Sequence, residues 1–205
     1  MDEIIKTTIK ALNNNNMPTK FVETCDEAKE LVMSMISEDD VIGAGGSMTL
    51  DQCKIRDELR EKKYDFLDWF LPELPMDKKK KALQKTLGCD VFLTSTNALT
   101  MDGKLYNVDG RGNRVAAMVY GPKKVIILTG KNKIVKNLQE AKERMETVAA
   151  PLNAKKLNRN TGCRKTGYCV DCKSEERICR HFLVTDRQKN DDRINIIIVN
   201  ENLGL

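Results

Sequence analysis

The stretch from Thr94 to Arg114 holds many side chains that could bind a ligand. Three asparagines, two aspartates, two arginines and three glycines follow the apolar run Asp90–Leu93. Loops at the carboxyl ends of strands bind ligands in open α/β sheets, because the strand fixes the origin of the loop. We therefore expect ligand contacts from this stretch, at Ser95, Asn97, Asn107, Gly110, Asn113 and Arg114. Asp102 and Asp109 are candidate catalytic bases.

A hairpin is the alternative for part of this stretch. Asp102-Gly103 and Asp109-Gly110 are turn dipeptides, so Leu99–Val108 could form two strands whose polar residues serve only the turns. That alternative explains Asn97, Asn113 and Arg114 less well, because none of them occupies a position where a turn needs it.

Two further loops could bind an anion. A short strand at Val41–Ile42 leads into Gly45, Gly46, Ser47 and Thr49, before a helix expected from about Leu50 to Lys62. A glycine-rich turn at a helix start can hold an anion with main-chain N–H groups, although such turns also occur with no ligand. Lys131 and Lys133 follow the strand Lys124–Thr129, where they could clamp a carboxylate or phosphate.

A cysteine cluster forms the fourth candidate site. Cys163, Cys169, Cys172 and Cys179 have the spacing C-x5-C-x2-C-x6-C, and four thiolates suffice for zinc or an iron–sulfur cluster. Free thiols on a loop, or regulatory oxidation, are the alternatives. Cys25, Cys53 and Cys89 are expected as small apolar residues of core elements.

The apolar pattern predicts the elements that position these groups. Lys124–Thr129 and Ile194–Val199 are nearly continuous β-branched runs, typical of parallel strands covered on both faces. A long amphipathic helix is expected from Ile134 to about Ala150. Strands alternating with helices predict an α/β fold with a largely parallel sheet and flanking helices. We expect a single domain over residues 1–205, with a Cys-rich loop insertion at about 158–182.

Composition limits the class of partner. The 205 residues carry a net charge of +5, and only 5% are aromatic, which is not typical of a nucleic-acid-binding protein. The chain lacks a secretory signal and any apolar run long enough to span a membrane. We expect a cytoplasmic protein that binds no membrane and no nucleic acid.

Several of these motifs, in this order, resemble the LUD (lactate-utilisation) domain family. They are Gly45-Gly46-Ser47 with Thr49-Leu50, the block from Ser95 to Arg114, Gly121–Val125, Gly130–Ile134 and the late cysteines. The resemblance implies a fold similar to ribose-5-phosphate isomerase, glucosamine-6-phosphate deaminase and CoA transferases. It also implies a link to lactate and organic-acid oxidation beside iron–sulfur or flavin oxidoreductase partners.

Three functions follow from these features. The first is an accessory LUD-domain subunit that binds a small anionic ligand and could form a homo-oligomer. The second is a stand-alone enzyme on a sugar-phosphate or acyl substrate, and the third is a metal or redox sensor. Covalent CoA-transferase chemistry is disfavoured, since Thr96 stands where those enzymes present a glutamate, and no histidine lies nearby in the sequence to activate its hydroxyl.

Overall fold

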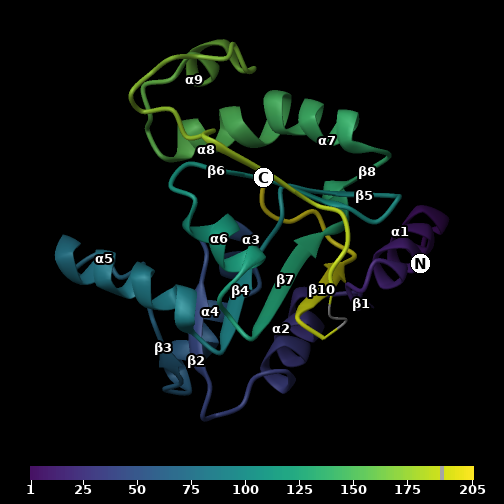
Figure 1. Cartoon of the computed structure of the whole chain (residues 1–205), viewed down its shortest axis with the longest axis vertical. Helices are drawn as coiled ribbons and strands as arrows, with labels where there is room; N and C mark the ends of the chain where they lie inside the picture. Colours follow the sequence, from purple (N-terminus) through teal and green to yellow (C-terminus); the bar gives the residue numbers. More distant parts are fainter. Residues whose placement is uncertain (190–191) are drawn as a thin grey trace.

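The computed structural model of the protein describes residues 1–189 and 192–205, and its centre is a sheet of six strands (Figure 1). The strands are β1 Thr19–Val22, β2 Val41–Ala44, β3 Asp65–Phe66, β4 Val91–Thr94, β7 Lys124–Gly130 and β10 Ile194–Val199. Their order is β1-β10-β7-β4-β2-β3, and every neighbouring pair is parallel. The predicted fold class is confirmed.

Helices cover both faces of this sheet. They are α1 Glu3–Asn14, α2 Cys25–Ser34, α3 Met48–Gln52, α4 Ile55–Glu61, α5 Met76–Lys85, α6 Asn113–Val119, α7 Leu138–Arg144, α8 Ala150–Lys156 and α9 Gly162–Thr166. Short 3-10 turns lie at Thr86–Gly88 and Lys131–Lys133, and a π turn at Met145–Ala149.

Successive side chains of a strand point to opposite faces, which divides the core in two. On one face, Leu93 and Ile126 pack in a cluster with α2, α3 and α4. On the other face, Phe92 and Val125 pack in a cluster with α1 and α6. The central strands are therefore apolar along their whole length, as the sequence predicted.

A second sheet lies beside the first and was not predicted. It consists of β8 Ile134–Val135, β5 Ala98–Thr100, β6 Leu105–Asp109 and β9 His181–Thr185, in the order β8-β5-β6-β9. β5 and β6 form an antiparallel hairpin, so the hairpin alternative is correct for this segment. In Figure 1, α7 and α8 lie across the top of the molecule, with α9 farther out.

Two predicted helices are shorter than expected. The helix from Leu50 to Lys62 is divided into α3 and α4, because Lys54 has a φ of 53° in the left-handed region. The helix expected to begin at Ile134 begins at Leu138. The side chain of Asn137 caps it by accepting a hydrogen bond from Glu140 N. Ile134 and Val135 instead pair with β5.

The cysteines outside the cluster differ from one another. Cys25 and Cys53 are joined in a disulfide, with their Cα atoms 4.7 Å apart, where the sequence led us to expect two separate apolar thiols. Cys89 is a buried free thiol, as expected, and burial raises its pKa to about 11. No helix within the described residues is both long and apolar enough to cross a membrane.

Candidate functional site

The carboxyl ends of three neighbouring strands bring the predicted loops together. β7, β4 and β2 are adjacent and parallel, so the loops that leave them begin at one edge of the sheet. These loops carry Lys133, Ser95 and Thr49, whose polar atoms lie in mutual contact. The Thr49 Oγ1 atom is 3.5 Å from Ser95 Oγ, and Lys133 Nζ is 3.0 Å from Ser95 Oγ.

Lys133 is a buried lysine that forms no ion pair with an acidic side chain among the described residues. Its side chain is only 3% exposed, and its ammonium donates to Ser95 Oγ, Thr49 Oγ1 and the Thr96 carbonyl. None of these acceptors carries a charge. Burial lowers the pKa of Lys133 to about 7, and the charges of Arg144 and Arg114 act in the same direction.

Arg114 is a structural residue rather than an open clamp. Its Nη1 donates to Ser95 O and Asn107 Oδ1, and its Nη2 donates to Asn97 Oδ1 and Val108 O. Its Nε lies 3.6 Å from Asp109 Oδ2. The four Nη hydrogens are all used within the fold and Nε faces Asp109, so Arg114 ties the loop after β4 to β6 and is not an open clamp for a ligand.

Arg144 is a cation of this site that the sequence did not single out. It lies at the end of α7, where its Nη1 donates to the Asn97 and Leu205 carbonyls and its Nε to Asn132 O. In the described part of the chain it forms no ion pair, and its Nη2 has no hydrogen-bond partner. Burial lowers its pKa. The only signal in the sequence was that Arg144 is a basic residue within the helix predicted from Ile134 to about Ala150.

The C-terminal segment covers Lys133. Gly204 has a φ of +68°, and a Cβ atom added to it would lie 2.6 Å from Thr49 Oγ1 and 2.8 Å from Lys133 Nζ. The segment is held by Leu203 N, which donates to Asn132 Oδ1, and by Gly204 N, which donates to Gln52 Oε1. Removal of water by this cover contributes to the burial that lowers the pKa of Lys133.

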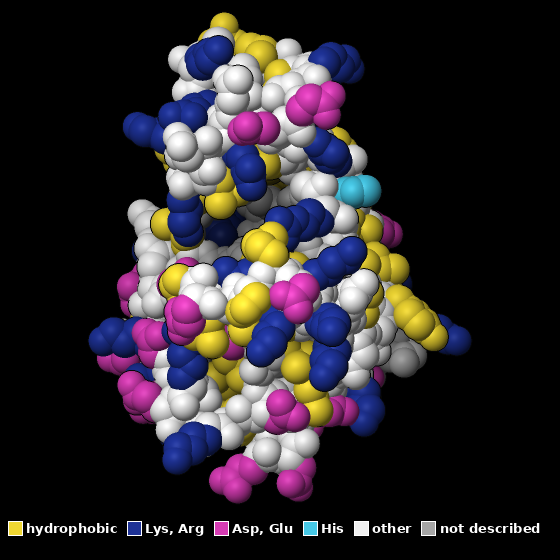
Figure 2. All heavy atoms as spheres, turned by 90° about the vertical axis from the view of Figure 1, so that its left-hand side faces the viewer, with side chains coloured by type: hydrophobic (Ala, Val, Ile, Leu, Met, Phe, Trp, Pro, Cys, Tyr) yellow, Lys and Arg dark blue, Asp and Glu magenta, His cyan; other side chains and the backbone are white. Residues whose placement is uncertain are grey.

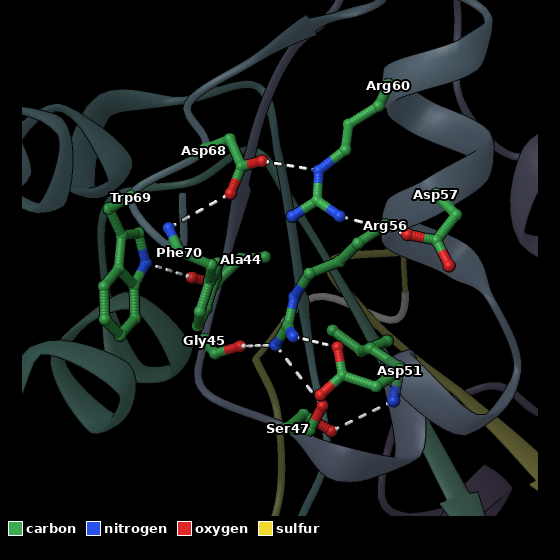
Figure 3. Close-up of polar contacts among 11 residues, drawn as sticks. Ala44, Gly45, Ser47, Asp51, Arg56, Asp57, Arg60, Asp68, Trp69 and Phe70 are labelled. Carbon is green, nitrogen blue, oxygen red and sulfur yellow. Dashed lines mark hydrogen bonds and ion pairs between the residues drawn. The ribbon is translucent and has the colours of Figure 1, made fainter. Parts of the chain in front are cut away.

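Arg56 holds the glycine-rich turn through hydrogen bonds to its backbone (Figure 3). Its Nη2 donates to the carbonyls of Gly45 and Ser47, and its Nη1 pairs with Asp51. Phe70 stacks 3.7 Å from the guanidinium carbon. The side chain of Ser47 caps α3 by accepting from Leu50 N. Sequence reasoning missed Arg56 because it lies within the helix expected from about Leu50 to Lys62, and no motif distinguishes it from the other charged residues there.

Other predicted residues have local structural partners. Asn97 accepts from Val108 N through Oδ1, and Asp109 Oδ1 accepts from Arg111 N and Gly112 N. Asn107 is fully buried, and its Nδ2 has no hydrogen-bond partner among the described residues. A polar atom placed beside this amide would satisfy it.

Four further predicted residues lie in other local environments. Asp102 lies in the hairpin turn, pairs with Lys104 and lines a separate hollow of about 640 Å³ beside Ile4 and Glu140. Lys131 points to the exposed side, where it donates to Asn200 Oδ1. Gly110 packs against Ile178, and Asn113 begins α6.

One face of the molecule is hollowed. Figure 2 turns the left-hand side of Figure 1 toward the viewer, and a depression separates the upper from the lower part of the molecule. Lys and Arg side chains stand around it. Gly46 is exposed, and no heavy atom lies within 4 Å of a Cβ built on it, so the space beside the glycine-rich turn is open.

The four clustered cysteines lie around one small cavity. Cys163, Cys169, Cys172 and Cys179 line a space of about 20 Å³, together with Ala150 and Arg177. Burial raises the pKa of Cys179 to about 11, and the neighbouring thiols add to the shift. Within residues 1–189 and 192–205, no three Cys, His, Asp or Glu side chains are already spaced to hold a metal ion. The cysteines are gathered, but they do not form a closed ligand set.

Comparison with known proteins identifies related sequences and folds. A family model described as LUD domain matches residues 5–199. The fold is similar to the crystal structure of a DUF162 family protein from Deinococcus radiodurans, with a TM-score of 0.53, 12% sequence identity and 97% of each chain covered. None of the curated proteins matches the chain.

Proposed function

Because the chain belongs to the LUD domain family, we propose that it acts in the use of lactate or a related organic acid by binding a small anion at Lys133. In this proposal it is a cytoplasmic accessory subunit for an iron–sulfur or flavin oxidoreductase. The observation that carries the proposal is a buried lysine, 3% exposed, whose Nζ contacts only hydroxyl and carbonyl oxygens within the described residues.

Electrostatics favours an anion at this position. Lys133 has only neutral acceptors among the described residues, while Arg144 also contacts Leu205 O and Arg114 has Asp109 nearby. A carboxylate or phosphate placed beside Lys133 would favour its ammonium form and receive hydrogen bonds from it and from the unpaired Nη2 of Arg144. The carboxylate of a hydroxy acid would match the charge of protonated Lys133, and it could accept hydrogen bonds from the hydroxyl groups of Ser95 and Thr49.

A thermal-shift screen at pH 7 tests the proposal. L-lactate, pyruvate and inorganic phosphate would be compared, since a ligand that binds only the folded state raises its melting temperature. We expect at least one of them to stabilise the protein, and Lys133→Met to abolish the shift. Lys136→Met is the matched control, because Lys136 is exposed and pairs only with Glu140. An equal shift in Lys133→Met would refute the site.

A second proposal is a metal ion held by the four cysteines. It is supported by their location around one cavity and by Arg177 beside them, whose charge would offset a tetrathiolate. A cavity of about 20 Å³ has room for one water-sized atom, which favours a single zinc ion over an iron–sulfur cluster. Binding would draw the four sulfur atoms inward and remove their protons.

Metal analysis of protein purified without oxygen separates these possibilities. Zinc in one-to-one ratio with colourless protein supports the zinc site, and a brown protein with iron and sulfide indicates a cluster instead. Cys179→Ser should lose the metal. Cys89→Ser is the control, since Cys89 is a buried thiol that belongs to the core of the main sheet. Metal-free protein, or metal retained in Cys179→Ser, would contradict the proposal.

A further inference from the structure

Ser95 and Lys133 form a pair that anion binding does not require. Ser95 follows β4 directly, at the carboxyl edge of the sheet, and its Oγ lies 3.0 Å from Lys133 Nζ. A serine hydroxyl is a weak nucleophile until a neighbouring base removes its proton, and a neutral lysine can serve as that base. The sequence placed no base near this loop, because Lys133 lies 38 positions later in the chain.

We propose that Ser95 is the nucleophile of an acyl-transfer site, with Lys133 as its general base. The substrate class is an ester or thioester of a small acid whose acyl group carries a second, anionic carboxylate. This preference for an anionic acyl group rests on the anion site proposed above, whereas the nucleophile and base do not.

Lys133 can act as a base because of what surrounds it. Arg144 on α7 and Arg114 on α6 are the charged groups that face it, and Asp109 is held on the far side of Arg114. Thr49 on α3 supplies no charge, and Leu205, which follows Gly204, contacts Arg144 through its O atom. Burial and the two guanidinium groups therefore both favour the neutral amine, and burial lowers the pKa of Lys133 to about 7.

The reaction balances with water as the second substrate. Ser95 Oγ attacks the carbonyl carbon of the ester while its proton passes to the Lys133 amine. The carbon–oxygen or carbon–sulfur bond then breaks, and the leaving group takes the proton from Lys133. Water, deprotonated in turn by Lys133, attacks the carbonyl carbon of acyl-Ser95. The acid leaves, and Lys133 returns the proton to Ser95 Oγ. The products are the free acid and an alcohol or thiol.

One polar group beside Ser95, and a second that is joined to the Ser95 backbone through Arg114, are available to stabilise the oxyanion of the intermediate. The Thr49 hydroxyl is 3.5 Å from Ser95 Oγ. Asn107 Nδ2 is buried without a partner among the described residues, and Arg114 Nη1 bridges the Asn107 amide to the Ser95 carbonyl. An unsatisfied buried donor is rare, and a ligand atom is one of the groups that can satisfy it.

Acylation by a small activated ester tests the pair directly. The full-length protein would be treated with p-nitrophenyl acetate, and the acetylated residue located by peptide mass spectrometry. We expect acetyl-Ser95, formed at a rate that rises with pH and is half-maximal near pH 7. Lys133→Arg keeps N–H donors at this position but stays protonated and cannot act as a base, so acetylation of Ser95 should fall by about 100-fold. Ser34→Ala, which removes an exposed helical serine, is the control, and acetylation of Ser95 should be unchanged in it.

The outcomes separate this inference from the proposed function. If the protein binds phosphate or lactate but Ser95 is never acetylated, the nucleophile is overturned and the anion site stands. If Ser95 is acetylated at the same rate in Lys133→Arg, the base is overturned. If Ser95 is acetylated but no anion binds, the dyad stands and the anion site falls. A faster reaction with the p-nitrophenyl monoester of succinate, lost in Arg144→Met, would support the substrate class, and equal rates would overturn it.

Discussion

Lys131 and Lys133 stand two positions apart and have opposite environments. The 3-10 turn between them sends Lys131 to solvent and Lys133 under the C-terminal segment. The sequence predicted that this loop would contribute cations, but it could not distinguish the two lysines. The cover comes from Gly204, which lies far away in the chain. For the same reason the sequence could not reveal that the donors of Arg114 are all used within the fold.

The buried ammonium gives a prediction for stability against pH. The pKa of Lys133 is about 7 in the folded protein and roughly 10.4 when unfolded, so between these values the unfolded chain binds more protons. The free energy of unfolding should therefore rise with pH in this window, by up to about 1.4 kcal/mol per pH unit from this group. In Lys133→Met this contribution should vanish.

Urea unfolding of both proteins at pH 7, 8 and 9 measures the difference. Other groups also contribute in this range: Cys89 and Cys179 have pKa values of about 11 in the fold and roughly 8.5 when unfolded, so the comparison uses wild type minus variant at each pH. Lys136→Met should follow the wild type. Parallel curves for wild type and Lys133→Met would show that Lys133 is charged in the fold.

Arg114 gives a second prediction at this scale. A lysine cannot contact Ser95 O, Asn97 Oδ1 and Val108 O at once, so Arg114→Lys leaves buried acceptors unpaired. We expect a loss of about 2–4 kcal/mol in the free energy of unfolding. Arg111→Lys, at an exposed position on the same loop, should change it by less than about 0.5 kcal/mol. Similar losses in both variants would show that Arg114 has no special structural role.

The elements were predicted where local pattern decides them. Lys124–Thr129 and Ile194–Val199 are strands because a run of β-branched residues has few alternatives at that length. The break at Lys54, where φ is 53°, had no signal in the sequence, whereas the start at Leu138 is set by a local cap at Asn137 that the apolar pattern alone does not reveal. The short strand β8 forms only by pairing with β5, and β9 only by pairing with β6.

The hairpin of β5 and β6 gives a prediction at the scale of elements. Gly103 in its turn has a φ of +86°, and a Cβ there would lie 2.6 Å from the Ala11 carbonyl carbon of α1. Gly167 has a similar φ of +82°, but no atom lies within 4 Å of its Cβ position. Gly103→Ala should therefore cost about 3 kcal/mol or more, and Gly167→Ala about 1 kcal/mol.

Thermal unfolding of the two alanine variants measures these costs. The matched φ angles separate backbone strain, which both variants share, from steric contact with α1, which only Gly103→Ala has. Equal melting temperatures would mean that the hairpin does not pack on α1 as described.

At the scale of the molecule, the site is assembled from segments far apart in the chain. Thr49, Ser95, Lys133 and Arg144 come from four elements, and Gly204 closes the group. Alternation of strands and helices sufficed to predict the parallel sheet and the edge where these loops meet. The second sheet and the position of Arg144 depend on pairings between distant segments, and no local pattern encodes them.

The central claim is that an anion binds beside the neutral amine of Lys133 and raises its pKa, so that the amine takes up a proton from the solvent. Isothermal titration calorimetry with sulfate at pH 8, in two buffers of different ionisation enthalpy, tests it most directly, because sulfate itself does not titrate there. The account predicts uptake of close to one proton per sulfate bound, since a group with a pKa of about 7 is mostly neutral at pH 8, and no binding in Lys133→Met. Binding without proton uptake, or unchanged binding in Lys133→Met, would contradict it.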